Sequence, residues 1–355
     1  MNLDFHTTHK VFQVNAGKMS AIDNASASLV VTSPPYPMIA MWDDIMALQN
    51  KDIGRALDNE DGYSAYELMH KELDLVWKEI DRVLMPGGIA CINIGDATRT
   101  IGGKFQLYPN HSRIISAFIE LGMSNLPNII WRKQTNAPNK FMGSGMLPGG
   151  AYVTLEHEWI LVFRKGPKRV FKSAEAKLKR QQSAYFWEER NQWFSDVWDL
   201  KGTQQLIPKS ESRSRSAAYP LSVPYRLIQM YSLYGELVVD PFGGTGTTAL
   251  AAIASGRAST SYDIDEAFVR LMLDNIKDID LAYFDKIINN RIENHRAFII
   301  ERSSNPKKSD IKYFNEDLDL KVMTKQELNM VLMKAASIES MDHGYKVLHK
   351  LFHPK

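Results

Sequence analysis

A glycine-rich segment after residue 239 has the residue types of a ligand-binding turn. It reads DPFGGTGTT at residues 240–248, between a predicted strand, Leu237–Val239, and a predicted helix, Thr245–Ser255. Glycines let the backbone turn tightly and approach a ligand, and the amide groups that begin a helix are free to bind one. Asp263 follows the next predicted strand, Ala258–Tyr262. It would therefore lie at the same edge of a parallel sheet as the turn, where ligands bind.

Three classes of nucleotide site could use this turn. A P-loop ends in Gly-Lys-Ser or Gly-Lys-Thr, and the turn contains no lysine. A dinucleotide site has the pattern G-x-G-x-x-G; position 249 is alanine, which that pattern tolerates, so this alternative is weak but open. The third class, the Asp-Pro-Phe-x-Gly-x-Gly-Thr loop that binds S-adenosylmethionine, fits throughout. Asp263 favours it too, because a carboxylate there could accept hydrogen bonds from both ribose hydroxyls.

A second segment, TSPPY at residues 32–36, ends the predicted strand Ser28–Thr32. Two prolines fix the backbone and present carbonyl groups and the Ser33 hydroxyl as acceptors beside the Tyr36 ring. The exocyclic amino group of cytosine or adenine is a poor nucleophile, and acceptors that hold its hydrogens stabilise the charge of the transition state. Tyr36 could stack on an extruded base, a contact worth about 1–3 kcal/mol. Such a segment on its own is more often a structural turn. Its occurrence together with the glycine-rich segment favours a catalytic role.

Alternating helix and strand patterns surround both segments. Residues 63–84 repeat apolar side chains at three- and four-residue spacing, which predicts a helix that stops at the Pro-Gly-Gly of residues 86–88. Ile89–Ile94 then has the composition of a buried strand, and two further strands are predicted at Asn128–Trp131 and Glu158–Phe163. This order predicts an α/β fold with a parallel sheet.

Residues 166–217 differ in charge from the rest of the chain. They carry 11 Lys and Arg against 6 Asp and Glu, whereas the remainder carries 32 against 35. Aromatic residues are interleaved with these charges, among them Tyr185, Phe186, Trp187, Trp193, Phe194 and Trp198. Basic and aromatic side chains suit phosphate neutralisation and base stacking. Five cations are therefore candidate DNA contacts: Lys177, Lys179, Arg180, Arg213 and Arg215. A solvated insert with its own aromatic core explains the composition equally well.

The overall composition narrows the class of protein. The 355 residues carry 43 Lys and Arg against 41 Asp and Glu, so net charge alone implies no nucleic-acid partner. Cys91 is the one cysteine, which excludes an intrachain disulfide and a cysteine-cluster metal site. The spacing of His and carboxylate residues suggests no metal site either. The polar N-terminus and short apolar runs predict a cytoplasmic protein without a signal peptide or membrane span.

Together the motifs resemble those of the β-group amino-methyltransferases of bacterial restriction–modification systems. In that family the catalytic strand-end motif precedes the cofactor loop, a permuted order that this chain shares. The resemblance extends over roughly residues 11–270. It includes these further segments: GIACINIGD (88–96), IWRK (130–133), EHE (156–158), VFRK (162–165), DVW (196–198), AYP (218–220) and RLI (226–228).

The resemblance implies a fold, a cofactor and a substrate. The fold would be an α/β, Rossmann-like methyltransferase fold with a mixed seven-stranded sheet, in which residues 128–131 and 158–163 form the end hairpin. Residues 1–165 would be its catalytic half and 218–270 its cofactor-binding half, with 166–217 as the target-recognition region and 271–355 as a helical C-terminal extension. The cofactor would be S-adenosylmethionine and the substrate double-stranded DNA.

The resemblance also assigns roles to individual residues. The target-base pocket would be formed by Ser33, Pro34, Pro35 and Tyr36. The cofactor would be bound by Tyr219, Pro220, Asp240, Phe242, Gly244, Thr245, Gly246, Thr247 and Asp263. Within that set Asp263 would hold the ribose, and Tyr219 and Pro220 would lie beside the methionine moiety.

Two positions depart from the family pattern. The family often has Gly-Asp after its first strand, where the Asp helps to hold the adenine amino group; this chain has Ala16-Gly17. The motif before Tyr219 usually begins with His-Pro, and here it reads Arg215-Ser216. Another contact must therefore serve adenine, or the affinity for the cofactor is lower. Neither change removes a catalytic group.

The motif favours cytosine N4 as the methylated atom, because family members with Ser-Pro-Pro-Tyr are mostly cytosine-N4 enzymes, whereas adenine-N6 enzymes more often carry Asp-Pro-Pro-Tyr. Both side chains are acceptors, so adenine N6 stays open. Cytosine C5 methylation needs a thiol nucleophile, and Cys91 lies mid-strand with no preceding proline, which argues against it. Two alternatives of another class are a non-catalytic DNA-binding subunit and, more weakly, a nicotinamide-dependent oxidoreductase. A partner restriction endonuclease and a monomer or homodimer are compatible with the resemblance.

Overall fold

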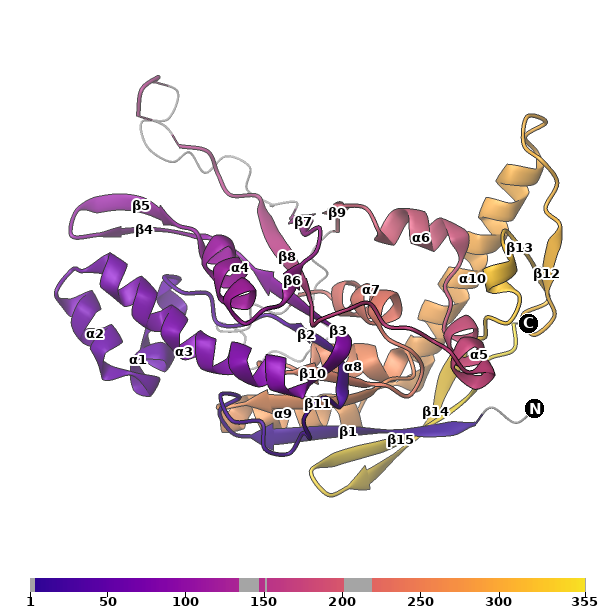
Figure 1. Cartoon of the computed structure of the whole chain (residues 1–355), viewed down its shortest axis with the longest axis horizontal. Helices are drawn as coiled ribbons and strands as arrows, with labels where there is room; N and C mark the ends of the chain where they lie inside the picture. The colour runs from indigo at the N-terminus through magenta and orange to yellow at the C-terminus, as the bar shows by residue number, and fades with distance from the viewer. Residues whose placement is uncertain (1–3, 134–146, 151, 201–218, 355) are drawn as a thin grey trace.

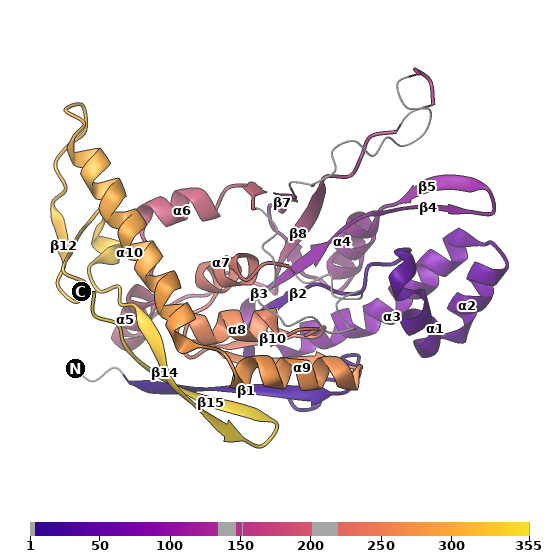
Figure 2. The same ribbon diagram turned by 180° about the vertical axis from the view of Figure 1, so that it is seen from behind.

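The computed structural model describes residues 4–133, 147–150, 152–200 and 219–354. A large mixed sheet crosses the molecule, and helices cover both of its faces (Figure 1; Figure 2). Its strands in the described residues are β1 (Phe5–Gln13), β2 (Ala27–Thr32), β3 (Leu84–Ile94), β6 (Ser124–Asn125), β7 (Ile129–Arg132), β8 (His157–Arg164), β9 (Val197–Asp199), β10 (Leu237–Asp240), β11 (Ala258–Asp263), β14 (Met333–Met341) and β15 (Gly344–Leu351). They are ordered β14-β15-β1-β11-β10-β2-β3-β8-β7-β9, with β6 beside β8.

The helices occupy the connections between these strands. In the described residues they are η1 (Ala40–Trp42), α1 (Asp43–Gln49), α2 (Lys51–Asp58), α3 (Gly62–Val83), α4 (Asn110–Glu120), α5 (Ala174–Gln182), α6 (Trp187–Trp193), α7 (Ser222–Tyr231), α8 (Thr247–Ala254), α9 (Glu266–Lys277), α10 (Leu281–Ser303) and η3 (Lys325–Glu327). Two small hairpins complete the fold: β4 (Ala97–Ile101) with β5 (Lys104–Tyr108), and β12 (Tyr313–Asn315) with β13 (Leu320–Val322). None of these helices has the length and apolar character needed to cross a bilayer.

Seven of the strands form the sheet expected from the sequence. The strands β1, β11, β10, β2 and β3 are mutually parallel, and β8 and β7 continue the sheet as an antiparallel end hairpin. The chain leaves the central pair in opposite directions, from β2 through α3 to β3 and from β10 through α8 to β11. Ligands bind outside the carboxyl ends of strands at such a switch point. We call this side of the sheet the carboxyl edge and the opposite side the amino edge.

Side-chain alternation along the central strands divides the core into two layers. In β2, Val30 packs with α3 and α4 on one face, whereas Leu29 and Val31 pack with α7, α8 and α9 on the other. Because successive side chains of a strand point to opposite faces, a strand covered on both sides buries all of its side chains and is mostly apolar. This explains why residues 27–32 are all buried.

The predicted helix over residues 63–84 is confirmed as α3. Asp61 caps it, since its carboxylate accepts a hydrogen bond from the Ser64 backbone N–H at 3.0 Å. The chain then passes directly into β3 at Leu84, so that the Pro-Gly-Gly segment ends the helix as expected but lies within the strand. Gly87 has a φ of +80°, which allows this abrupt change of direction.

The C-terminal extension is helical only as far as Ser303. Residues 313–351 contain β12, β13, β14 and β15, which corrects the expectation of a helical extension over residues 271–355. β15 pairs antiparallel with β1, and β14 pairs with β15, so these strands widen the main sheet. Buried polar residues interrupt the alternation of apolar side chains that would identify these strands in the sequence. Thr7, for example, contacts His349 across the strands at 2.8 Å, and both are buried.

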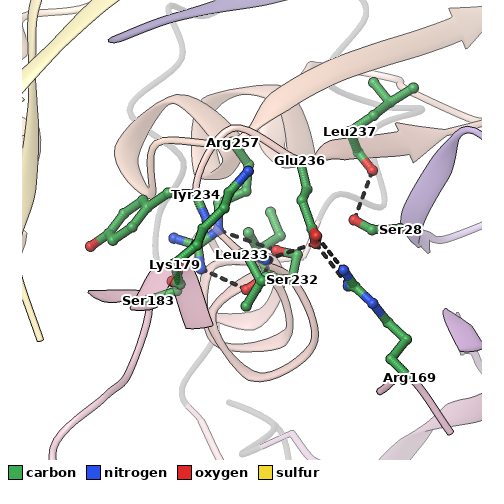
Figure 3. Close-up of polar contacts among 11 residues, drawn as sticks. Ser28, Arg169, Lys179, Ser183, Ser232, Leu233, Tyr234, Glu236, Leu237 and Arg257 are labelled. Atoms are coloured by element: carbon green, nitrogen blue, oxygen red, sulfur yellow. Dashed lines mark hydrogen bonds and ion pairs between the residues drawn. The ribbon is translucent and has the colours of Figure 1, made fainter. Parts of the chain in front are cut away.

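The basic segment after Gly166 is joined to the amino edge by the contacts in Figure 3. Arg169 donates to Glu236 at 3.0 Å, and the Tyr234 N–H donates to the Ser183 hydroxyl at 3.0 Å. Beneath them Arg257 is fully buried and donates to the Ser232 carbonyl at 2.7 Å. Glu236 and its neighbours immediately precede β10, so α5 lies at the amino edge (Figure 1).

From α5 the chain crosses to the carboxyl edge through α6 and β9, which pairs parallel with β7. Three aromatic residues of this segment are buried: Phe186, Trp193 and Trp198. Phe186 stacks on His295 of α10, with ring centroids 4.0 Å apart. These three rings hold the segment against α10 and the end of the sheet, so they are not free to stack on bases.

Candidate active site

A cavity opens at the carboxyl edge where β2 and β10 lie side by side. It is lined by the ends of four parallel strands and by α1, α3 and α9. Its walls include these residues of the two predicted motifs: Ser33, Pro34, Pro35, Tyr219, Asp240, Phe242, Gly244, Thr245, Thr247 and Asp263. Residues more than 200 positions apart in the chain thus meet at one site, as the sequence motifs predicted.

The glycine-rich turn adopts the conformation that its sequence requires. Gly244 and Gly246 have φ values of +51° and +85°, in the left-handed region that favours glycine. Gly246 immediately precedes α8, and a Cβ atom there would lie 2.6 Å from the Cγ atom of Met272. The turn is therefore pressed against α9 on one side and leaves its other side to the cavity.

Asp263 organises the turn. Its carboxylate accepts hydrogen bonds from the Gly244 N–H and from the Asp265 N–H, both at 2.9 Å. Burial raises the pKa of this carboxyl group above its ordinary value. Each carboxylate oxygen can accept a second hydrogen bond. Asp263 can therefore hold the turn and bind ribose hydroxyls at the same time.

Asp240 joins two turns that we name after their predicted roles: the cofactor turn, residues 240–248, and the catalytic turn, residues 33–36. It is buried at the end of β10, and its Oδ1 atom accepts from the Thr32 hydroxyl at 2.6 Å and from the Phe242 N–H at 3.1 Å. Thr32 is the last residue of β2 and directly precedes Ser33. The relative position of the two motifs is thus fixed by a buried carboxyl group.

Stability should depend on pH through Asp240. Burial raises the pKa of this group from its ordinary 3.8 to about 6. Because the folded-state pKa is the higher one, the group stabilises the fold fully below pH 4, and this contribution is lost as the pH rises through about 6. A shift of this size corresponds to about 3 kcal/mol. Denaturant unfolding of wild type and Asp240→Asn between pH 4 and 7 measures it. Parallel profiles for the two proteins would contradict the assignment.

Tyr219 and Pro220 are buried beside the turn, and the Tyr219 hydroxyl is hydrogen-bonded to that of Thr248 at the start of α8. Tyr219 lines the cavity, which agrees with its predicted place. Arg213 and Arg215, two of the candidate DNA contacts, lie outside the described residues.

Lys177, Lys179 and Arg180 are exposed on α5 and lie at the amino edge, on the side of the sheet opposite the cavity. The structure therefore does not bring these three candidate DNA contacts together with the catalytic turn. Residues 166–217 were expected to form one target-recognition region, but their described part runs from one edge of the sheet to the other.

The catalytic turn contains partners that the sequence motifs did not assign. The Tyr36 hydroxyl donates to Glu158 at 2.9 Å and receives a hydrogen bond from Asn93 at 2.8 Å. Glu158 forms an ion pair with Lys133. Tyr36 is buried, and its ring packs on Gly95, where a Cβ atom would lie 3.0 Å from the ring. One signal was available: Asn93 is a lone polar residue in the apolar run of β3.

The cavity offers the groups that S-adenosylmethionine requires. Phe242, Ile264 and Phe268 supply an apolar surface, and Asp263 supplies ribose acceptors. Where the family often has an aspartate, Asn15 and Gln49 line the cavity and hydrogen-bond to each other at 2.9 Å. Glu72 lines the cavity as well, so these two amides and this carboxylate are polar groups available to adenine in place of the missing aspartate.

Two other chemistries find no support in the described residues. Cys91 is buried in the middle of β3, and burial raises the pKa of its thiol, which disfavours a thiolate nucleophile. The described part of the chain contains no cluster of three or more His, Cys, Asp or Glu residues that could hold a metal ion.

A parallel sheet with a glycine-rich turn at its switch point and an acceptor-rich turn beside it defines a methyltransferase of exocyclic amino groups. Residues 27–274 match the family of DNA methylases that act at N6 or N4, and the chain belongs to that family. It is therefore a DNA methyltransferase that uses S-adenosylmethionine.

Relatives support this membership over nearly the whole chain. The type II methyltransferase M.MthZI of Methanothermobacter thermautotrophicus is 51% identical over 328 residues, which cover 92% of this chain and 90% of that protein. M.MjaI of Methanocaldococcus jannaschii is 48% identical over 287 residues, covering 78% and 93%. Among solved structures, a putative DNA modification methylase of Thermus thermophilus, complexed with S-adenosyl-L-methionine, matches with a TM-score of 0.58 and 30% identity over 76% of this chain and 94% of that one.

Proposed function

We propose that the protein is a site-specific type II methyltransferase that methylates N4 of cytosine in duplex DNA. The observation that carries this proposal is the Ser33 hydroxyl in the wall of the cavity, where adenine-N6 enzymes more often have a carboxylate. The neighbouring acidic side chain, Glu158, is bonded to Tyr36 and Lys133 and not directly to Ser33.

The turn would act on a base that has left the duplex. A cavity recessed at the carboxyl edge is accessible to a flipped nucleotide but not to a base stacked within a helix. Ser33 Oγ and the carbonyl groups of the proline turn would accept the amino hydrogens, so that the nitrogen lone pair can attack. S-adenosylmethionine supplies the electrophilic methyl group, and the protein aligns the two reactants. Because the acceptors bind more strongly as the nitrogen becomes positive, they stabilise the transition state more than the substrate.

Nucleoside mass spectrometry tests the target base. Plasmid DNA from a methylation-deficient host that expresses the protein should contain N4-methylcytosine, and DNA from the same host with an empty vector should not. N6-methyladenine in its place would overturn the cytosine assignment while leaving the cofactor site intact. Mapping the modified positions would then give the recognition sequence. We further propose that this modification protects DNA from a partner restriction endonuclease cutting at the same sequence.

DNA binding should not depend on the cations of α5. Each phosphate contact contributes roughly 0.9 to the slope of log affinity against log salt, so three contacts would contribute about 2.7. Since Lys177, Lys179 and Arg180 lie at the amino edge, we expect the variant Lys177→Gln, Lys179→Gln, Arg180→Gln to keep the wild-type slope. Fluorescence anisotropy with a cognate duplex at several salt concentrations measures it. A slope reduced by about 2 or more would mean that DNA reaches the amino edge.

A further inference from the structure

Four side chains from three strand ends form a continuous hydrogen-bonded group behind Ser33. We call it the Glu158 network: Ser33 and Tyr36 after β2, Asn93 of β3, and Glu158 of β8. Asn93 Nδ2 lies 2.7 Å from Glu158 Oε2, and Tyr36 Oη lies 2.9 Å from the same oxygen. The Ser33 hydroxyl lies 3.1 Å from Tyr36 Oη. Asn93 is buried, and the Glu158 side chain is only 13% exposed, so water competes little for these bonds.

Counting hydrogens fixes the direction of each bond in the Glu158 network. A carboxylate only accepts, so Glu158 Oε2 receives hydrogens from Asn93 and from Tyr36. Tyr36 has a single hydroxyl hydrogen, and Glu158 receives it. The bond between Ser33 and Tyr36 must therefore be donated by Ser33. The Ser33 proton then points toward Tyr36. Asn93 Nδ2 also lies 3.4 Å from Ser33 Oγ, but its two hydrogens serve the shorter bonds to Glu158 and Tyr36, so Ser33 Oγ keeps a lone pair for another donor.

We propose that Glu158 is a positioning residue for methyl transfer: through Tyr36 it orients the Ser33 hydroxyl so that its lone pairs face the amino group of the target base. This inference rests on the proposed role of Ser33 as an acceptor. It applies equally to cytosine N4 and adenine N6, because both are exocyclic amino groups that lose electron density during transfer.

Neighbouring groups keep the Glu158 network in this hydrogen-bonding arrangement. Lys133 pairs with Oε1 of Glu158, on the side away from Tyr36. Burial and the nearby Glu158 carboxylate raise the pKa of the Tyr36 hydroxyl far above its ordinary value, so Tyr36 keeps its proton and remains a donor. Hydrogen bonds to a charged acceptor are shorter and stronger than neutral ones, and chains of them polarise one another. The negative charge of Glu158 therefore polarises the Ser33 hydroxyl.

The variant Glu158→Gln tests the proposal. A glutamine amide can donate to Tyr36 Oη, which releases the Tyr36 proton toward Ser33 and turns the Ser33 proton toward the base. We expect the single-turnover rate of methyl transfer to fall roughly 10- to 100-fold, as for other residues that orient a reacting group from behind. The dissociation constants for S-adenosylmethionine and DNA should change less than twofold. The matched control is Glu156→Gln, which changes an exposed side chain two residues earlier in the chain and should keep the wild-type rate.

A double-variant comparison separates positioning from general damage. Tyr36→Phe keeps the ring but removes the hydroxyl, and we expect it to lower the rate about as much as Glu158→Gln. Adding Glu158→Gln to Tyr36→Phe should then lower the rate less than twofold further, because the path through Tyr36 is already broken and the remaining contact, from Asn93 Nδ2 to Ser33 Oγ, is 3.4 Å long. Two losses that multiply would overturn the proposal, as would a wild-type rate for Glu158→Gln. The base identified in wild-type DNA is an independent result: N6-methyladenine would overturn the cytosine assignment and leave this comparison valid.

Discussion

Replacing Ser33 with alanine should lower the rate of methyl transfer about 100- to 1000-fold, the range found when one preorganised hydrogen-bonding group is removed from a charge-stabilising site. Ser33 lies in the wall of the cavity, and its hydroxyl is held by Tyr36 from behind. Alanine keeps the turn but leaves one amino hydrogen without an acceptor as the nitrogen becomes positive. The backbone carbonyl groups of the turn remain, so a residual rate is expected.

Single-turnover transfer of a labelled methyl group measures this effect, and calorimetry measures cofactor binding separately. The affinity for S-adenosylmethionine should be unchanged, because the cofactor turn is held by Asp240 and Asp263, both of which are intact in this variant. Ser116→Ala, which removes an exposed hydroxyl on α4, is the matched control and should behave as wild type. A wild-type rate for Ser33→Ala would show that the backbone acceptors suffice.

Replacing Asp263 with alanine should weaken S-adenosylmethionine binding about 100-fold, or roughly 3 kcal/mol. The carboxylate would bind the ribose and also accepts the Gly244 and Asp265 N–H groups. The variant therefore loses cofactor contacts and leaves the Gly244 amide of the turn and the Asp265 amide before α9 without their acceptor. Both losses act on the same site, so affinity should fall more than stability.

Isothermal titration of wild type, Asp263→Ala and the control Asp278→Ala would measure the change. Asp278 is an exposed carboxylate at the other end of α9, so its removal alters charge without touching the cavity. Thermal unfolding without ligand reports whether the turn alone is weakened. An unchanged dissociation constant for Asp263→Ala would contradict the ribose assignment.

The cofactor turn and the catalytic turn could be predicted because each is local. The functional groups of each turn come from consecutive residues. Each turn also follows a strand that its apolar composition identifies, as in Ser28–Thr32. Parallel strands end at one edge, so two such motifs must meet there even when more than 200 residues separate them. The residues that line the cavity and its place at the carboxyl edge could therefore both be predicted from the sequence.

The Glu158 network could not be predicted in the same way. Asn93 and Glu158 meet because β3 and β8 pair antiparallel, in a register that places Asn93 opposite Ile160. No local pattern specifies that register. The C-terminal strands were missed for a different reason: His349 and Thr7 are buried but polar, so apolar alternation understates how much of β15 and β1 is covered. The place of α5 depends on contacts such as that of Arg169 with Glu236, 67 residues apart.

The position of β1 has a consequence for how the protein is made. β1 is synthesised long before its partners in the sheet, β11 and β15, which follow it by some 250 and 340 residues. Contacts this distant in sequence are slow to form and leave an unpaired strand edge exposed while they are awaited. Asn15, which follows β1 and lines the cavity, takes its place only when β11 has emerged. The nascent chain therefore cannot complete the cavity until β11 has been translated.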